Sequence, residues 1–388
     1  MSTPGAATPD APCLRIDLQA LAHNWRVVQR ACAGAVLGVV LKSDAYGLGV
    51  GQVLPTLWAL GSRDFWVGTL DEAAALQAQL HALRPSAPYR IYVLHGLADQ
   101  APRDWAASGC IPVLAGAHEL QRLQAGAGRA GHLPVAVNLD TGLTRLGFGA
   151  GDLALLAPGS SSWQHARPCL WLSHLGRFEN PQAPQCLAQR ERFVQWTARL
   201  PAAPRSMASS SSVFAGSPWL FEQVRVGSAL WGVSISVLPQ PPLQPVASLA
   251  APVLHVREVA AGTEVGYAGR YTTPGPRRVA TVALGYADGL PFGLANQGAL
   301  MLLGRRAPII GGIAMGLTAL DVSAYAPGEV RPGQWAEVYG RQQTLARLAA
   351  AAGVAPAALL TLSARLARQR SVEPLASAAC PSVVEALP

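Results

Sequence analysis

Short apolar runs alternate with amphipathic stretches along the first 240 or so residues of the chain. The run from Val36 to Leu41 is apolar on both faces, as in a strand buried on both sides of a parallel sheet. Apolar residues at helical spacing precede it, beginning after Asp17 and ending before Gly34. This pattern predicts a helix with an aspartate N-cap and a glycine beyond its last turn.

Seven further runs repeat the strand pattern, five of them clearly and the last two more weakly. They are Phe65–Val67, Arg90–Leu94, Ile111–Leu114, Val135–Leu139, Leu170–Leu172, Ser206–Ala208 and Val224–Val226. Eight strand-and-helix units within about 240 residues predict an α/β fold of the (β/α)8 TIM-type barrel class. A doubly wound parallel sheet is the alternative.

The pattern changes at the proline-rich segment Pro239-Gln240-Pro241-Pro242. Short β-rich runs punctuated by Gly and Pro follow, such as Val253–Val259 and Arg278–Leu284. We therefore expect a barrel domain over 13–240 and a mainly β C-terminal domain over 241–370. The end of the chain, 371–388, is rich in Ala, Ser and Pro and is expected to be loosely ordered.

Composition narrows the functional classes. The 388 residues are 50% hydrophobic and 13% charged, which is typical of a compact globular protein. The net charge of +8 comes from scattered arginines without a basic run interleaved with aromatics, which argues against nucleic-acid binding and would suit an anionic small molecule.

The spacing of the cysteines and the first residues of the chain indicate the cellular compartment. The six cysteines are widely spaced and form no Cys-x-x-Cys pair, which argues against a structural zinc site or a disulfide framework. The first dozen residues lack the features of a signal peptide, and no later segment has 18 uncharged apolar residues in a row. We expect a cytoplasmic protein that is not bound to membranes.

Lys42 is the only lysine in the sequence, and it stands at the carboxyl end of the first predicted strand. Arginine stays protonated, whereas a lysine amine can lose its proton and attack a carbonyl group to form a Schiff base. A chance survivor on the surface is the alternative. In a barrel, strand ends converge on one face, so residues that follow other strands are expected beside Lys42. They are Asn138, Arg145, His174, Ser210 and Arg225.

Other catalytic motifs fail at these positions. Gln52 stands where a dinucleotide fingerprint beginning at Gly47 needs its third glycine. Arg122 stands where an H-E-x-x-H zinc motif beginning at His118 needs its second histidine. Neither a dinucleotide site nor a zinc protease site is therefore expected.

Six motifs lie in order along both predicted domains. The first is the segment 40–49, Val-Leu-Lys-Ser-Asp-Ala-Tyr-Gly-Leu-Gly, and the others are Leu139–Gly147, Leu172–Leu175, Val224–Gly227, Gly266–Ala268 and Gly285–Gly289. Segment 40–49 resembles the cofactor-lysine motif of the alanine racemase family, which depends on pyridoxal 5'-phosphate, and the other motifs follow in that family's order.

The resemblance implies a racemase that interconverts L- and D-alanine and so produces D-alanine. Lys42 would hold the cofactor as an internal aldimine and act as acid and base on one face of the substrate α-carbon. Tyr267 would serve the opposite face, because racemisation removes a proton from one side and returns it to the other. In the family this tyrosine comes from the partner subunit, which implies a homodimer with shared sites.

The resemblance also assigns roles to the remaining matched residues. Arg225 would meet the pyridine nitrogen and limit the cofactor's capacity as an electron sink, and His174 would orient the ring. Arg145 would approach the cofactor oxygen and the substrate carboxylate. Phosphate contacts are implied for Tyr46, Ser210, Gly227 and Ser228, and substrate contacts for Met315 and Tyr286. Taken singly, each of these residues is also compatible with a structural role.

Three positions depart from the family pattern. Asn138 replaces a lysine that is carbamylated in many members, and we expect its amide, alone or with a bound chloride, to hold Arg145. Gly316 and Ala364 replace an aspartate and a tyrosine, which removes polar bulk. Serine, a broader substrate set, or a cofactor-binding homologue without activity are therefore the alternatives to alanine.

Overall fold

The computed structural model describes residues 10–125, 132–177, 183–233, 238–367 and 369–374. The chain divides into two compact units, one formed by residues 24–243 and the other by residues 1–23 together with 244–388.

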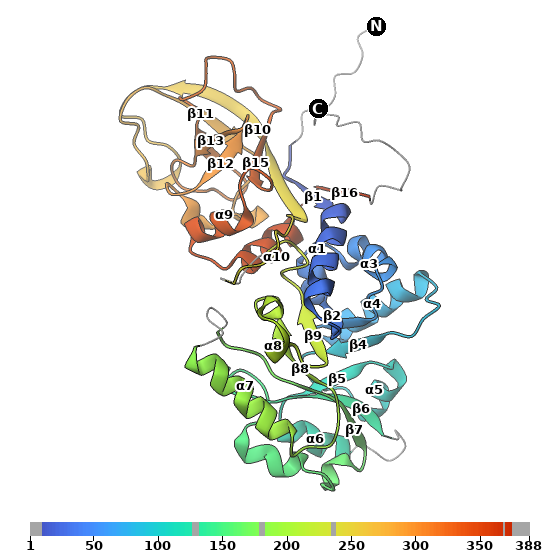
Figure 1. Cartoon of the computed structure of the whole chain (residues 1–388). Helices are drawn as coiled ribbons and strands as arrows, with labels where there is room; N and C mark the ends of the chain where they lie inside the picture. Colours follow the sequence, from blue (N-terminus) through green and yellow to red (C-terminus); the bar gives the residue numbers. More distant parts are fainter. Residues whose placement is uncertain (1–9, 126–131, 178–182, 234–237, 368, 375–388) are drawn as a thin grey trace. The chain divides into compact units, whose positions relative to one another are not determined.

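The first unit is built on eight parallel strands that close into a barrel (Figure 1). Strand β9 pairs with β2, where Val36 lies opposite Gln223, so the sheet has no free edge. This closure confirms the predicted barrel and excludes a doubly wound sheet. The barrel strands are β2 Val36–Val40, β3 Asp64–Val67, β4 Arg90–Val93, β5 Ile111–Leu114, β6 Leu133–Asn138, β7 Ala166–Leu172, β8 Arg205–Ser209 and β9 Gln223–Val226.

Helices connect the strands of the barrel. Helix α1 Leu18–Ala31 precedes β2 and begins where predicted, and the Asp17 carboxylate accepts the Ala20 N–H at 2.8 Å as its N-cap. The other α-helices are α2 Lys42–Tyr46, α3 Val50–Ala59, α4 Leu70–Ala82, α5 Pro102–Ser108, α6 Ala117–Ala125, α7 Pro184–Thr197 and α8 Ser217–Leu220. Short 3-10 turns occur at Ala150–Leu156, Ser161–Trp163 and Val213–Ala215.

The C-terminal unit is mainly β-structure, as predicted, with the sheet order β13-β12-β15-β10-β1-β16. The long strand β10 also pairs with β11, which in turn pairs with β14. The strands are β1 Cys13–Asp17, β10 Ala247–Val259, β11 Arg277–Val282, β12 Ala299–Leu302, β13 Arg305–Pro308, β14 Thr318–Asp321, β15 Trp335–Tyr339 and β16 Gln369–Glu373. Two α-helices, α9 Leu345–Ala352 and α10 Pro356–Leu366, and 3-10 turns at Tyr267–Gly269, Tyr286–Asp288 and Phe292–Leu294 complete the unit.

The N-terminal boundary differs from the expectation that the barrel domain begins at residue 13. Strand β1 pairs with β10 and β16, so it belongs to the C-terminal unit. The residue pattern of a five-residue strand does not indicate which distant strands it pairs with. The sequence pattern therefore could not assign β1 to the C-terminal unit. The expected loose tail was wrong for residues 371–373, which lie in β16, because β1 offers them a hydrogen-bonding edge. Residues 375–388 lie outside the described residues.

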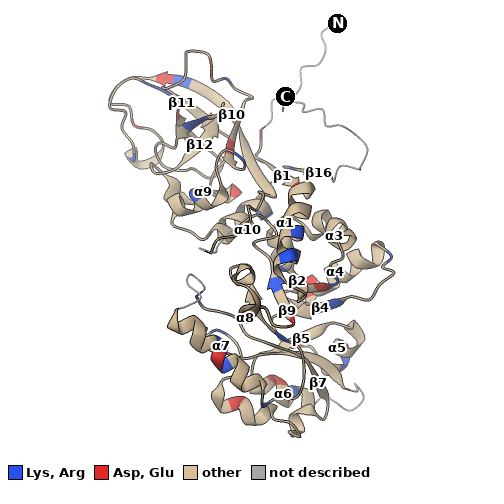
Figure 2. Ribbon diagram, viewed as in Figure 1, with Lys and Arg blue, Asp and Glu red and all other residues tan. Residues whose placement is uncertain are grey.

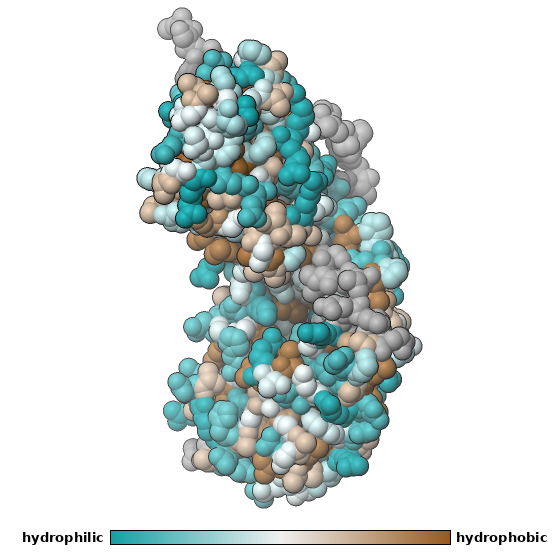
Figure 3. Space-filling view, turned by 90° about the vertical axis from the view of Figure 1, so that its left-hand side faces the viewer, coloured by the Kyte–Doolittle hydropathy of each residue, from teal (hydrophilic) through white to brown (hydrophobic). Residues whose placement is uncertain are grey.

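Polar and apolar residues mix on the surface. Figure 2 shows basic residues dispersed among acidic ones in both units, and Figure 3 shows hydrophilic and hydrophobic residues interspersed over the visible face. The cysteines within the described ranges form no disulfide. In the described part of the chain, no single helix is long and apolar enough to cross a membrane, and α9 and α10 reach that length only as a pair bent by 102°.

Candidate active site

The structure brings the predicted site residues together in two groups, one in each unit. The first group lies at the carboxyl end of the barrel, on β9 and on the segments that follow β2, β6, β7 and β8. It comprises Lys42, Tyr46, Arg145, His174, Ser210, Arg225, Gly227 and Ser228. The second group comprises Tyr267, Tyr286 and Met315 in the C-terminal unit.

Lys42 opens a turn that winds in the left-handed sense. The four residues after it have φ of 55° (Ser43), 53° (Asp44), 53° (Ala45) and 59° (Tyr46). Left-handed helix costs roughly 1–2 kcal/mol per non-glycine residue, and such strain persists where the surroundings enforce it. A sequence of ordinary helix formers gave no signal of this turn.

Local hydrogen bonds hold this turn in place. The Gly47 N–H donates to the Ser43 carbonyl at 2.8 Å, and the Asp44 carboxylate accepts the Val50 N–H at 2.7 Å. From outside the turn, the Glu72 carboxylate accepts the N–H groups of Ser43 at 2.8 Å and Gly68 at 2.7 Å. Glu72 therefore ties the segment next to Lys42 to the loop before α4.

The environment of Lys42 favours its neutral amine. Partial desolvation lowers the pKa of the amine from its ordinary value of 10.5, and the nearby Arg145 guanidinium lowers it further. The Glu72 carboxylate acts in the opposite direction. A lysine whose pKa is lowered is a better nucleophile at neutral pH than one with an ordinary pKa.

Arg225 is a buried cation on β9, with 7% of its surface exposed. Its guanidinium donates to the Ser206 hydroxyl and to the Ser173 carbonyl, both at 2.6 Å. Burial and the charge of Arg145 lower the pKa of Arg225 to about 10, so it remains protonated at neutral pH. Both acceptors are neutral, and the positive charge is therefore available to a group at the barrel end.

His174 follows β7 and is kept neutral. Desolvation and the cations Arg225, Arg145 and Lys42 lower its pKa to about 3. Its carbonyl accepts the Gln189 side-chain amide at 3.2 Å, which fixes the backbone at this position. A neutral imidazole can stack on or orient a flat ring without adding another positive charge.

Ser210, Gly227 and Tyr46 form a cradle of hydroxyl and N–H groups. The buried Ser210 hydroxyl accepts the N–H of Gly227 at 3.0 Å and that of Ala229 at 3.3 Å. A Cβ at Gly227 would lie 2.4 Å from the Tyr46 hydroxyl, so only glycine fits there. Burial raises the pKa of Tyr46 to about 12, which keeps its hydroxyl as a donor. With the adjoining Ser228, this geometry suits a phosphate group.

Arg145 lies on a loop between β6 and the 3-10 turn Ala150–Leu156, and carboxylate and amide contacts fix this loop. The Asp140 carboxylate accepts the N–H groups of Gly142, Leu143 and Thr144 at 2.9–3.0 Å. These backbone bonds outweigh the effect of desolvation and lower the pKa of Asp140. The loop therefore presents Arg145 from a firmly anchored turn.

Asn138 contacts the backbone next to Arg145. Its amide donates to the Leu146 carbonyl at 2.8 Å, and no hydrogen bond joins it to the Arg145 side chain among the described residues. Asn138 therefore holds the loop beside Arg145, and the expected role of a bound chloride stays a prediction.

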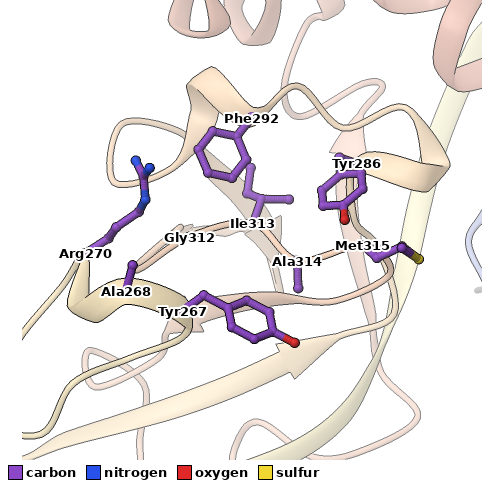
Figure 4. Close-up of a pocket in the computed structure, with 9 residues that line it drawn as sticks. All are labelled: Tyr267, Ala268, Arg270, Tyr286, Phe292, Gly312, Ile313, Ala314 and Met315. Carbon is purple, nitrogen blue, oxygen red and sulfur yellow. The ribbon is translucent and has the colours of Figure 1, made fainter.

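The second group lines a cavity of about 400 Å³ in the C-terminal unit (Figure 4). Figure 4 shows Tyr267 on one side of the segment Gly312–Met315 and Tyr286 on the other, with Arg270 at the far end. Tyr267 is 77% exposed and Met315 64%, so both are available for contacts beyond this unit. The remaining lining residues are Ala268, Phe292, Gly312, Ile313 and Ala314.

Two positions in this unit, Gly316 and Ala364, depart from the family pattern and lie in different surroundings. Gly316 follows Met315, and a Cβ added there would meet nothing within 4 Å. Ala364 is fully buried on α10, next to Ser363, whose hydroxyl lies 2.9 Å from that of Tyr339. Gly316 therefore leaves open space beside the cavity, whereas Ala364 is part of the core.

Sequence reasoning missed residues that support the first group. Glu72 supports the turn after Lys42, and Ser206 and Ser173 hold Arg225. The ring of Trp66 on β3 lies 5.5 Å from the Arg225 guanidinium carbon. These contacts join strands far apart in the chain, and no local pattern could have shown them.

Comparison with known proteins agrees with both units. Residues 16–235 match the alanine racemase N-terminal domain and residues 246–370 match the alanine racemase C-terminal domain. An alanine racemase from Methylobacterium nodulans is 38% identical over 349 residues, which cover 90% of this chain and 92% of that protein.

Solved structures give the same answer. The alanine racemase from Bartonella henselae, with covalently bound pyridoxal phosphate, is 31% identical with a TM-score of 0.87, covering 94% of this chain and 100% of that one. The biosynthetic alanine racemase from Pseudomonas aeruginosa is 28% identical with a TM-score of 0.85 and the same coverage. The chain therefore belongs to the alanine racemase family.

Proposed function

We propose that this protein is an isomerase that interconverts L- and D-alanine with pyridoxal 5'-phosphate as its cofactor. The observation that carries the proposal is the arrangement at the barrel end, where the amine of Lys42, with its lowered pKa, lies close to Arg145, His174 and Arg225. The relatives named above support it, because they are alanine racemases and this chain matches each of them over nearly its whole length.

The residues at the barrel end fit the cofactor. The Ser210 hydroxyl, the Gly227 N–H and the Tyr46 hydroxyl would hold its phosphate, with Ser228 beside them. Arg225 is a buried cation with neutral partners, suited to the acceptor nitrogen of a pyridine ring, and neutral His174 would orient that ring. Pyridoxal phosphate, when bound, supplies an aldehyde that reacts with amines and a ring that delocalises the charge left by the departing α-proton.

Proton exchange needs a group on each face of the substrate α-carbon. We assign Lys42 to one face, because its lowered pKa favours the neutral amine, which can accept and return a proton. We assign the Tyr267 hydroxyl to the other face. Its 77% exposure in the C-terminal unit fits a residue that completes the site of a second subunit, so we infer a homodimer with shared sites.

Arg145, Met315 and Tyr286 are assigned to the substrate. The Arg145 guanidinium would bind its carboxylate, the Met315 N–H would donate to the same group, and Tyr286 would line the entrance. Asn138 would act on Arg145 through the Leu146 carbonyl, and a chloride near Asn138 would balance the charge of Arg145. Removing halide from the buffer should then raise the KM for alanine, and adding chloride back should restore it.

One observation favours a second candidate substrate. The open space at Gly316, beside Met315, would accept a side chain larger than a methyl group, so serine or a broader set of amino acids is the alternative. Comparing kcat/KM for alanine, serine and a larger amino acid in wild type and Gly316→Asp tests this. Preference for the larger substrates should fall in the variant.

A deuterium experiment tests the main proposal. Purified protein loaded with pyridoxal phosphate is incubated with L-alanine in deuterated water, and α-deuterium and D-alanine are followed together. Both should appear. Normal cofactor binding without any exchange would show a cofactor-binding homologue without racemase activity.

The single lysine makes the cofactor attachment testable by mass. Borohydride reduction of the loaded protein should fix the pyridoxyl group on Lys42, and Lys42→Arg should abolish this adduct. An adduct found only on the N-terminal amine would contradict the assignment of Lys42.

A further inference from the structure

Trp66 lies in the middle of the barrel, where it carries two structural costs. It is fully buried, and its indole Nε1 has no hydrogen-bond partner among the described residues, although a buried indole N–H usually finds one. It also requires glycine at position 38, because a Cβ there would lie 2.5 Å from that nitrogen. A leucine at position 66 would fill apolar space without an unsatisfied donor.

The face of the indole has specific neighbours. The Tyr92 ring stacks on Trp66 with the ring centroids 4.2 Å apart and the planes 7° from parallel. The Arg225 guanidinium carbon lies over the Trp66 ring, 5.5 Å from its centroid. This distance is within the range of a cation–π interaction, which is strongest for tryptophan and for desolvated cations.

Arg225 needs such support. It is almost fully buried, and its guanidinium donates hydrogen bonds to a hydroxyl and a carbonyl, not to a carboxylate. Two neutral acceptors compensate only partly for the lost hydration of a guanidinium. The negative face of the Trp66 ring adds attraction without neutralising the charge, so the cation remains available to a ligand.

We propose that Trp66, braced by Tyr92, is a positioning residue that holds the charged Arg225 side chain where it meets the cofactor's ring nitrogen. This inference rests on the proposed binding of pyridoxal phosphate with Arg225 at that nitrogen. Trp66 itself acts through Arg225 and is not assigned any contact with the cofactor.

The test changes the electrostatics of the indole face while keeping its shape. Mono-, di- and trifluorotryptophan are introduced at position 66 alone, which progressively withdraws electron density from the ring face. Dissociation constants of the cofactor-free protein are measured for pyridoxal phosphate and for 1-deazapyridoxal phosphate, in which C–H replaces the ring nitrogen. The same series at Trp58, whose ring carries Arg63 at 3.8 Å outside the site, is the matched control.

Fluorination at position 66 should weaken pyridoxal phosphate binding stepwise, by about fivefold to tenfold at the trifluoro stage, since a buried cation–π contact is of that strength. Binding of the deaza analogue should not change, and the Trp58 series should affect neither ligand. Equal losses of affinity for both ligands would show that Trp66 acts only by packing. An unchanged affinity for pyridoxal phosphate across the series would show that the cation–π contact has no role in binding. Each of these results would overturn the inference.

Failure of the proposed function gives a different result. If unmodified protein does not bind pyridoxal phosphate, the cofactor assignment itself is wrong and the role of Trp66 falls with it. If unmodified protein binds pyridoxal phosphate and its deaza analogue equally, Arg225 does not meet the ring nitrogen, and the inference is overturned while cofactor binding stands.

Discussion

The protonation states at the barrel end follow from a few neighbouring side chains. Desolvation keeps the His174 imidazole neutral, and the charges of Arg225, Arg145 and Lys42 act in the same direction. Desolvation and Arg145 also favour the neutral amine at Lys42, which Glu72 opposes from the side of α4. Charge at this site is therefore controlled first by desolvation and then by repulsion between cations, and one carboxylate moderates it.

The lowered pKa of Lys42 can be measured directly. Because it is the only lysine, reductive methylation with ¹³C-formaldehyde gives one lysine signal whose pH titration reports its pKa. In cofactor-free protein, this pKa should lie below that of a free dimethyl-lysine. Glu72→Gln should lower it further by removing the opposing carboxylate, whereas Asp71→Asn on the exposed side of α4 should not. An unchanged or higher pKa in Glu72→Gln would contradict this account.

The neutral state of His174 makes the stability of the protein depend on pH. Its pKa falls from 6.5 to about 3 on folding, so the unfolded chain binds the proton first as pH is lowered. The contribution of the neutral His174 side chain to the unfolding free energy is fully present above pH 6.5 and is lost as the pH falls towards 3. His174→Asn should reduce the pH dependence of the unfolding free energy in this window by up to about 1.4 kcal/mol per pH unit.

Urea unfolding of cofactor-free protein at a series of pH values measures this slope. His81→Asn, at an exposed position on α4, is the control and should leave the slope unchanged. Equal slopes in wild type and His174→Asn would show that His174 is protonated in the folded protein.

At the scale of elements, the left-handed turn after β2 is a strained segment held by tertiary contacts. Backbone hydrogen bonds brace it, such as those from the Ala45 N–H to the Leu41 carbonyl and from the Gly49 N–H to the Asp44 carbonyl, and the Glu72 and Asp44 carboxylates accept further N–H groups. The turn ends at Gly47, where φ is 81°. Strain of this kind persists where the surroundings enforce it, here in the segment directly after Lys42.

A glycine substitution tests the strain. Ser43→Gly removes the steric penalty of φ near 55° at an exposed position, and it should raise the unfolding free energy by about 0.5–1 kcal/mol after the entropy of glycine is counted. Ala75→Gly, exposed within the right-handed helix α4, should lower it by about 1 kcal/mol. Thermal or urea unfolding measures both, and a loss of stability in Ser43→Gly would show that the turn is relaxed.

At the scale of the whole molecule, the two groups of candidate residues belong to different compact units. Tyr267, Tyr286 and Met315 are exposed on the C-terminal unit, whereas Arg225 and Ser210 are buried in the barrel. If the site is shared between subunits, each subunit supplies a barrel end to one site and a tyrosine to the other.

Subunit mixing tests this arrangement. Lys42→Arg and Tyr267→Phe, each inactive alone, are mixed under conditions that exchange subunits. Half of the dimers would then be hybrids with one intact site of two, so activity should return to about a quarter of wild type. No recovery, with hybrid formation verified by mass spectrometry, would place Lys42 and Tyr267 of the same chain in one site.

The barrel, and the chemistry at the carboxyl end of its strands, could be predicted from the amino-acid sequence. Apolar runs such as Val36–Val40 show a strand buried on both faces, and eight of them in order imply closure. The side chains that follow these strands then converge by topology alone. Lys42 was recognisable because its amine has a reactivity that arginine lacks.

Tertiary structure decided the features that depend on contacts between distant segments. Strand β1 joins the C-terminal sheet because β10 and β16 offer it partners, and Asn138 holds the Leu146 carbonyl instead of Arg145. The left-handed turn and the place of Trp66 beneath Arg225 likewise arise from packing across the barrel. Local patterns record burial and period, but they do not record which distant groups meet, because that is set by closure of the whole sheet.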